Sequence, residues 1–311
     1  MQPSTRDPGF LAAATHDPAD SFGYFLAGVF MLVVWSVLAV AVLMLIFHIV
    51  GSRNSDIEPF LGELKYFLSV AIMLPILALI VRQFHGRPII TLISTDARFD
   101  TGQCARSASL WFVLLGSFVL LEILIDPETD LVLGVRSIWD VALILGVILP
   151  VILAQVAAEE VVIRGYMAQY FYRLVRNRWF VGAVTTLIFV LLHGSMMSQL
   201  HVLVGIFLFL MVLRTNRLEA AIGVHFAQNV LAFLVLGQEF GDHPTPWPTL
   251  LQLEEGGVGA PEPWRLTIAD GILAGLFAAY WFLAFRLGWV MRRDAPAAGP
   301  AAQTAATPTG P

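Results

Sequence analysis

The sequence predicts an all-α fold: a polytopic membrane bundle of about eight transmembrane helices. Hydrophobic residues make up 58% of the 311 residues, charged residues only 13%, and the mean hydropathy is +0.77. A soluble domain of this length carries roughly 25% charged residues. The apolar residues also form runs long enough to cross a bilayer, which takes about 17–25 residues per helix. This composition excludes an ordinary soluble enzyme. In a membrane chain the arginine-rich segments indicate topology, so we expect no nucleic-acid partner.

The apolar runs predict the helices one by one. We expect them at about residues 25–49, 65–84, 109–126, 138–160, 180–197, 200–214, 218–237 and 267–288. The first run starts at Gly23 and exceeds the ~7–15 residues of a signal-peptide apolar region. We therefore expect it to stay in the membrane as an anchor.

The basic residues support this number of crossings. With both termini in the cytoplasm, the cytoplasmic segments hold most of the 18 lysines and arginines: Arg6, Arg82, Arg87, Arg98, Arg106, Arg173, Arg176, Arg178, Arg214, Arg217, Arg286, Arg292 and Arg293. The outer segments hold only Arg53, Lys65, Arg136 and Arg265. This bias follows the positive-inside rule and predicts a multi-pass protein of the cell membrane with both termini cytoplasmic.

The remaining segments divide the chain into three parts. Residues 1–22 form a polar cytoplasmic segment, 23–293 a single transmembrane domain with a catalytic core at about 138–237, and 294–311 a low-complexity, disordered tail. The loop at about 238–266 is rich in proline and glycine and is expected to be irregular. The only cysteine, Cys104, is expected in an arginine-containing loop, and it excludes an intrachain disulfide or a cysteine-based zinc cluster.

Three predicted helices carry polar residues at membrane depth. The fourth contains "AAEEVVIRGY", the fifth "IFVLLHGS" and the seventh "IGVHFAQNV". Such groups are functional-site candidates by default, because burying them in a membrane is costly. The candidates are Glu159, Glu160, Arg164, Phe189, His193, His225 and Asn229.

Their spacing separates the charges. Glu160 and Arg164 are four residues apart, so they share a helix face and can pair. Glu159 points about 100° away from Glu160 and is left as the carboxylate with no local cation. His225 and Asn229 are also four apart, so imidazole and carboxamide project from one face.

If the three helices converge, their side chains suit activation of a water molecule. Glu159 would act as general base and His193 would orient the same water. His225 and Asn229 would donate hydrogen bonds to a developing oxyanion. This chemistry is peptide hydrolysis without a metal, a cofactor or a covalent intermediate.

The three motifs resemble a known family. "EEVVIR" fits EExxxR, "FVLLH" fits FxxxH and "HFAQN" fits HxxxN, in this order on separate helices. Together they are similar to the CAAX protease and bacteriocin-processing family, also called the Abi family, of intramembrane glutamic endopeptidases. The resemblance implies that Glu159 and His193 hold the catalytic water, that His225 and Asn229 form the oxyanion site, and that Arg164 is supporting. It also implies a membrane-associated peptide or protein substrate, with prenylated CAAX proteins among the family's substrates.

Other functions stay open. Glu159, His193 and His225 are the right residue types for a three-ligand zinc site, although the chain has no HExxH. The chain also fits a non-catalytic immunity factor, scaffold or transporter. A serine nucleophile is disfavoured, because Ser195 and Ser198 do not sit in a nucleophile-elbow pattern.

Several of the candidates also have a purely structural interpretation. Glu160 and Arg164 can form an ion pair at a helix end, and Phe189 can be a packing residue. A membrane histidine often makes only a helix–helix hydrogen bond. His201 is interpreted as an interfacial residue at the start of the sixth helix.

The predicted membrane depths of Glu159 and His193 disagree in this arrangement of helices. At about 1.5 Å per residue, Glu159 lies about 30 Å along the fourth helix from Asp140, and His193 about 20 Å along the fifth. The depths match only if the helices tilt or the fourth helix is misplaced. We expect a cavity that opens toward the cytoplasmic half of the membrane.

Overall fold

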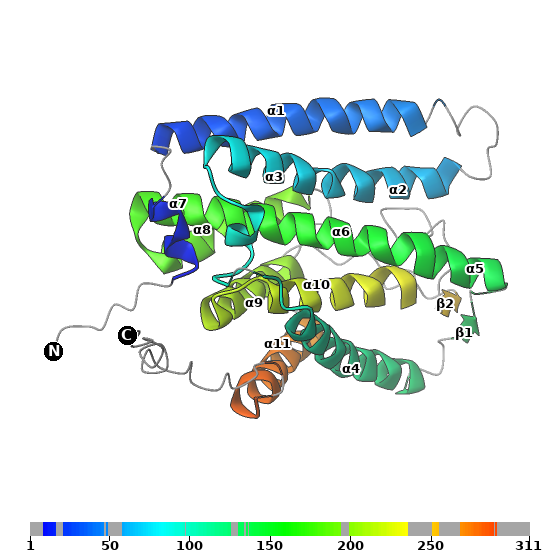
Figure 1. Cartoon of the computed structure of the whole chain (residues 1–311). Coiled ribbons are helices and arrows are strands. Elements are labelled where there is room, and N and C mark those ends of the chain that lie inside the picture. The colour runs from blue at the N-terminus through cyan, green and yellow to red at the C-terminus, as the bar shows by residue number, and fades with distance from the viewer. Residues whose placement is uncertain are drawn as a thin grey trace, which may run out of the picture.

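The computed structural model describes most of the membrane domain and shows it to be helical (Figure 1). The described residues are 9–16, 21–46, 48, 58–96, 98–125, 130–133, 135, 137–193, 199–235, 251–254, 268–288 and 290. Four helical segments are long and apolar enough to span a membrane, and four shorter apolar helices follow them. The predicted all-α membrane bundle is confirmed. The predicted tail, 294–311, lies outside the described residues.

The helices are arranged around one long central helical run, Ile138–Val175. The α-helices are α1 (Ser21–Ile46), α2 (Glu58–Ala71), α3 (Met73–Phe84), α4 (Thr101–Ile125), α5 (Ile138–Leu143), α6 (Leu149–Glu160), α7 (Ala168–Val175), α8 (Arg178–Leu192), α9 (Gln199–Thr215), α10 (Glu219–Val230) and α11 (Ile268–Trp281). In Figure 1, α1 and the α2–α3 pair lie along one side of this run, and α10, α4 and α11 lie on the other.

The fourth predicted helix is longer than expected. Residues 138–175 form one helical span that joins α5, α6 and α7 through two π-helical segments, Ile144–Ile148 and Val161–Met167. The prediction that it ends at 160 is wrong. The charges that suggested an end, Glu160 and Arg164, neutralise each other inside the bundle, so the helix continues through them.

A tight turn joins α7 to α8 and removes the depth disagreement. Arg176 adopts a left-handed conformation (φ 55°), and the Asn177 side chain accepts hydrogen bonds from the first turn of α8. Glu159 and His193 each lie about 25 Å from this turn, counted at about 1.5 Å per residue along their own helices. The two residues are therefore at similar depth because the fourth span extends past 160.

Helix α10 is held close against α4. A Cβ atom at Gly223 would lie 2.2 Å from the backbone oxygen of Cys104, so only glycine permits this approach. Helix α4 begins at Thr101, eight residues earlier than predicted. Cys104 and Arg106 are therefore helical, which corrects their placement in a loop, and the Arg106 guanidinium reaches the Val290 carbonyl.

Segments predicted to share a side of the membrane meet in the structure. At one end, the Arg87 side chain donates hydrogen bonds to Tyr24 and Gln169, and the Leu218 amide donates to Ile93. At the other end, β1 (Asp130–Leu133) pairs antiparallel with β2 (Leu251–Glu254). The loop at 238–266 is thus not wholly irregular, because β1 provides a hydrogen-bonding partner for part of it.

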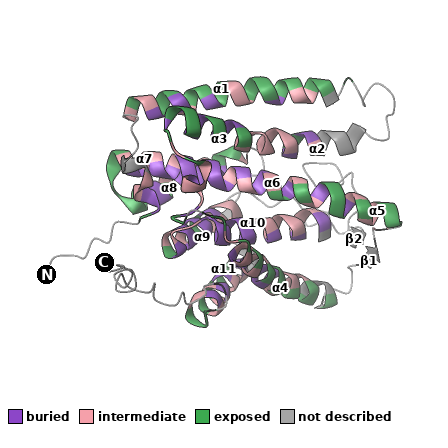
Figure 2. Cartoon of the chain, in the orientation of Figure 1, coloured by how far each residue is buried: buried purple, intermediate pink, exposed green. Residues whose placement is uncertain are grey.

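The outer surface of α1 is apolar, as a lipid-facing helix requires. Figure 2 shows exposed residues along this helix, and its large exposed side chains include Phe25, Val33 and Val37. In contact with lipid, such surface needs no protein partner.

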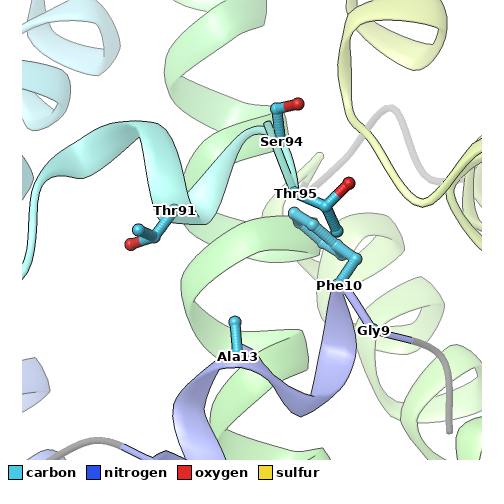
Figure 3. Close-up of a pocket in the computed structure, with 6 residues that line it drawn as sticks. All are labelled: Gly9, Phe10, Ala13, Thr91, Ser94 and Thr95. Carbon is cyan, nitrogen blue, oxygen red and sulfur yellow. The ribbon is translucent and has the colours of Figure 1, made fainter. Parts of the chain in front are cut away.

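The segment before α1 is only partly polar. Phe10 and Leu11 are buried, and the short helix Leu11–His16 packs against α7. The ring of Phe10 points toward Thr95 beside a cavity of about 240 Å³ (Figure 3). The apolar side chains explain why this part of the predicted polar segment joins the core.

Candidate functional site

The two adjacent glutamates lie at the end of α6, where the helix widens. Glu160 is the last residue of α6, and the π-helical segment Val161–Met167 contains Arg164. Single π-helical turns inside α-helices are frequent at functional sites. A Cβ atom at Gly165 would lie 2.5 Å from the Leu92 carbonyl oxygen, so glycine lets this wide turn pack against the neighbouring backbone.

Glu160 connects two helices through one oxygen. Its Oε1 accepts from Arg164 Nη1 and from His225 Nδ1, each at 2.9 Å, and the Glu160 and Arg164 side chains are fully buried. The predicted Glu160–Arg164 pairing is present. Because the carboxylate only accepts, the His225 proton sits on Nδ1, and Nε2 is directed toward the other glutamate.

Glu159 has a different environment. Its Oε1 accepts from Gln155 Nε2 at 2.5 Å, and its Oε2 lies 3.7 Å from His225 Nε2, beyond hydrogen-bond distance. Among the described residues, no side chain or backbone group hydrogen-bonds to Oε2. The side chain is 12% exposed, whereas that of Glu160 is fully buried. Glu159 thus retains an oxygen with acceptor capacity.

Asn229 joins the same group through Gln155. The Asn229 Nδ2 atom donates to Gln155 Oε1 at 3.3 Å, across the contact between α10 and α6. His225 and Asn229 lie one turn apart on α10, so both reach the α6 glutamates from one face. The convergence expected for these residues is therefore present in the structure.

His193 lies at the end of α8, and a hydrogen bond defines which ring nitrogen carries its proton. Its Nδ1 is 2.7 Å from the Phe189 carbonyl oxygen, one turn earlier. A carbonyl oxygen can only accept, so Nδ1 donates, and the neutral ring has its lone pair on Nε2. In that form Nε2 can accept a proton from water. The structure records no direct hydrogen bond from His193 to either glutamate.

Phe189 links His193 to the other residues. Its ring centroid lies 4.5 Å from that of His193 and 5.7 Å from that of His225, and the Arg164 guanidinium carbon is 4.2 Å from the ring centroid. Cation–π attraction adds to this packing. Phe189 is buried and packs against side chains from three helical segments.

Two further side chains belong to this neighbourhood: Gln155, which was missed in the sequence, and His201, which was interpreted as interfacial. Gln155 lies four residues before Glu159, and that spacing in an apolar helix was the available signal. The His201 ring, on α9, lies 4.3 Å from the ring of His193, so His201 is not only an interfacial residue. Helices α8 and α9 pack against each other, and sequence spacing alone does not predict that contact.

The structure gives no support for the serine or zinc alternatives within the described residues. Ser195 and Ser198 lie outside the described residues. Within the described part of the chain, no three histidine, cysteine or acidic side chains are grouped to hold one metal ion. The expected cavity toward the cytoplasmic half stays a prediction. A described cavity of about 240 Å³ lies elsewhere, between α4, the α5–α6 run and α10, and its lining is apolar.

Comparison with known proteins gives a family match for the region that contains these residues. Residues 140–231 match the family model described as type II CAAX prenyl endopeptidase Rce1-like. The uncharacterized protein YyaK of Bacillus subtilis is 23% identical over 195 residues, which cover 59% of this chain and 62% of that relative. No solved structure gives a significant match. The matched region includes Glu159, His193 and Asn229, and this region of the chain is similar to the Rce1-like type II CAAX prenyl endopeptidases.

Proposed function

We propose that this chain is an intramembrane glutamic endopeptidase that cleaves a membrane-associated peptide without a metal ion. The family of residues 140–231 supports a protease. The observation that carries the mechanism is the environment of Glu159: one carboxylate oxygen engaged by Gln155, and the other facing His225 without a hydrogen bond.

In this mechanism Glu159 takes a proton from a water molecule that His193 Nε2 helps to orient. The resulting hydroxide attacks the carbonyl carbon of the scissile peptide bond. Negative charge develops on the carbonyl oxygen, where Asn229 and His225 donate hydrogen bonds. Because His225 Nδ1 donates to Glu160, donation from Nε2 as well requires the imidazolium form. Glu159 then gives its proton to the leaving amine, which completes hydrolysis.

The substrate class follows from the membrane setting and the family. A peptide that reaches a buried glutamate must enter the bilayer region, which favours a lipidated or otherwise membrane-associated chain. A CAAX-type prenylated peptide is the specific candidate.

The first experiment compares wild type with Glu159→Gln in cells, by mass spectrometry of protein termini in membrane fractions. We expect termini that wild type produces to be absent with Glu159→Gln. Asp140→Asn is the matched control, because it makes the same carboxylate-to-amide change in the same helical run, far from the site. Identical termini with wild type and Glu159→Gln would favour a non-catalytic role.

A second experiment tests the substrate and the metal with purified protein. An S-farnesylated peptide that ends in Cys-aliphatic-aliphatic-X is expected to lose its last three residues. Protein purified without chelator is expected to cleave it equally well before and after dialysis against chelator. One equivalent of zinc together with chelator-sensitive cleavage would instead support a zinc site built from Glu159, His193 and His225.

A further inference from the structure

Gln155 makes two hydrogen bonds that tie together the two halves of the proposed site. Its Nε2 donates to Glu159 Oε1 at 2.5 Å, and its Oε1 accepts from Asn229 Nδ2 at 3.3 Å. The residue is 3% exposed and lies on α6, one turn before Glu159. It therefore spans the contact between α6 and α10 on the side where the two motifs meet.

The chemistry of the three groups fixes the orientation of both amides. An ionised Glu159 can only accept, so the Gln155 amide must present its NH₂ group to the carboxylate. Its carbonyl oxygen then faces Asn229, which must present its own NH₂ group in return. A flipped Gln155 would set its oxygen against the Glu159 carboxylate and lose both bonds.

We propose that Gln155 is a positioning residue that sets Glu159 and Asn229 for the reaction. This inference rests on the proposed function. By occupying Glu159 Oε1, Gln155 leaves Oε2 as the oxygen that takes the proton from water. By accepting one Asn229 proton, it aims the second proton of that NH₂ group into the site. One side chain thus fixes the distance between the general base and the oxyanion donor.

Another buried glutamine provides a matched control. Gln169 is fully buried in the same helical run, where it accepts from Arg87 and donates to the Thr91 carbonyl. It touches neither glutamate nor α10 residues among its recorded hydrogen bonds. Gln155→Met and Gln169→Met make the same isosteric change, and each removes two hydrogen bonds.

The test measures kcat and KM for the S-farnesylated CAAX-type peptide, with melting temperature in detergent micelles recorded for each variant. We expect Gln155→Met to lower kcat by about tenfold to a hundredfold, as misplacement of catalytic groups does, with KM within about twofold of wild type. Gln169→Met is expected to lower the melting temperature and leave kcat unchanged. Gln155→Met combined with Asn229→Ala is expected to lower kcat by much less than the product of the single effects.

Three different results would overturn the inference. If Glu159→Gln abolishes cleavage but Gln155→Met keeps the wild-type kcat, Gln155 does not position the site while the proposed function stands. If wild type and Glu159→Gln leave the peptide equally intact, or cleave it equally, the proposed function fails and the inference falls with it. Equal losses of kcat in Gln155→Met and Gln169→Met would also overturn it, since they would indicate general destabilisation.

Discussion

The two adjacent glutamates, Glu159 and Glu160, differ in the partners that compensate their charge. Glu160 contacts Arg164 and His225 through hydrogen bonds of 2.9 Å and is fully buried. Glu159 is hydrogen-bonded by a neutral amide from Gln155, and its nearest recorded cationic candidate, His225, is 3.7 Å away. Glu160 therefore contributes to the fold, whereas the environment of Glu159 leaves an oxygen for chemistry.

This difference predicts opposite outcomes for two single substitutions. Arg164→Met removes the strong cation beside Glu160, and breaking a buried pair from one side costs about 3–5 kcal/mol. Glu159→Gln keeps the shape and can still accept from Gln155, so stability is expected to change little while cleavage stops. Chemical denaturation in micelles measures the first effect, and peptide cleavage the second.

A third variant separates loss of charge balance from loss of packing. Glu160→Leu with Arg164→Met removes both members of the pair, and apolar replacement of a whole buried pair is often close to neutral. We expect the double variant to be more stable than Arg164→Met alone. Wild-type stability in Arg164→Met would contradict the assignment of this pair to the fold.

At the scale of elements, the sequence predicted the helices better than their ends. Apolar runs identify spans because a bilayer selects for length and hydrophobicity. The described part of the chain has eight apolar helical segments near the predicted positions. The end of the fourth span was wrong because the predicted Glu160–Arg164 pair was placed at a helix end, whereas the structure buries it inside the bundle. The role of Gln155 was missed because its second partner, Asn229, is on another helix.

The contact between α4 and α10 predicts a strong effect of one methyl group. Gly223→Ala would place a Cβ atom 2.2 Å from the Cys104 backbone oxygen, so the helices must separate. Overpacking of this kind costs about 1–3 kcal/mol. Because His225 and Asn229 follow on the same helix, cleavage is also expected to fall. Thermal unfolding and the peptide assay measure both effects.

Gly275→Ala provides the control for that substitution. Gly275 lies in α11, and a Cβ atom there would meet nothing within 4 Å. Alanine in an open helical position is expected to keep or slightly raise stability. If Gly223→Ala and Gly275→Ala behave alike, the close approach of α4 and α10 is not what holds α10 in place.

At the scale of the whole molecule, the two ends of the bundle differ in composition. The end that contains the α7–α8 turn includes Arg87, Arg176 and Arg217. The opposite end has the β1–β2 pair, in which Asp130 and Glu254 are register partners. Contacts within each end agree with the alternation that the eight crossings require. The positive-inside rule predicts that the arginine-rich end faces the cytoplasm.

Cysteine labelling tests this orientation, and the sequence makes it simple because Cys104 is the only native thiol. Arg176→Cys and Ser137→Cys, each in a Cys104→Ala background, place one exposed thiol at either end of the fourth span. In intact cells, a membrane-impermeant maleimide is expected to label Ser137→Cys, and to label Arg176→Cys only after the membrane is permeabilised. The reverse pattern would invert the bundle. Glu159 and His193 lie at similar distances from the α7–α8 turn, so the orientation also decides from which side a substrate's cleavable end approaches them.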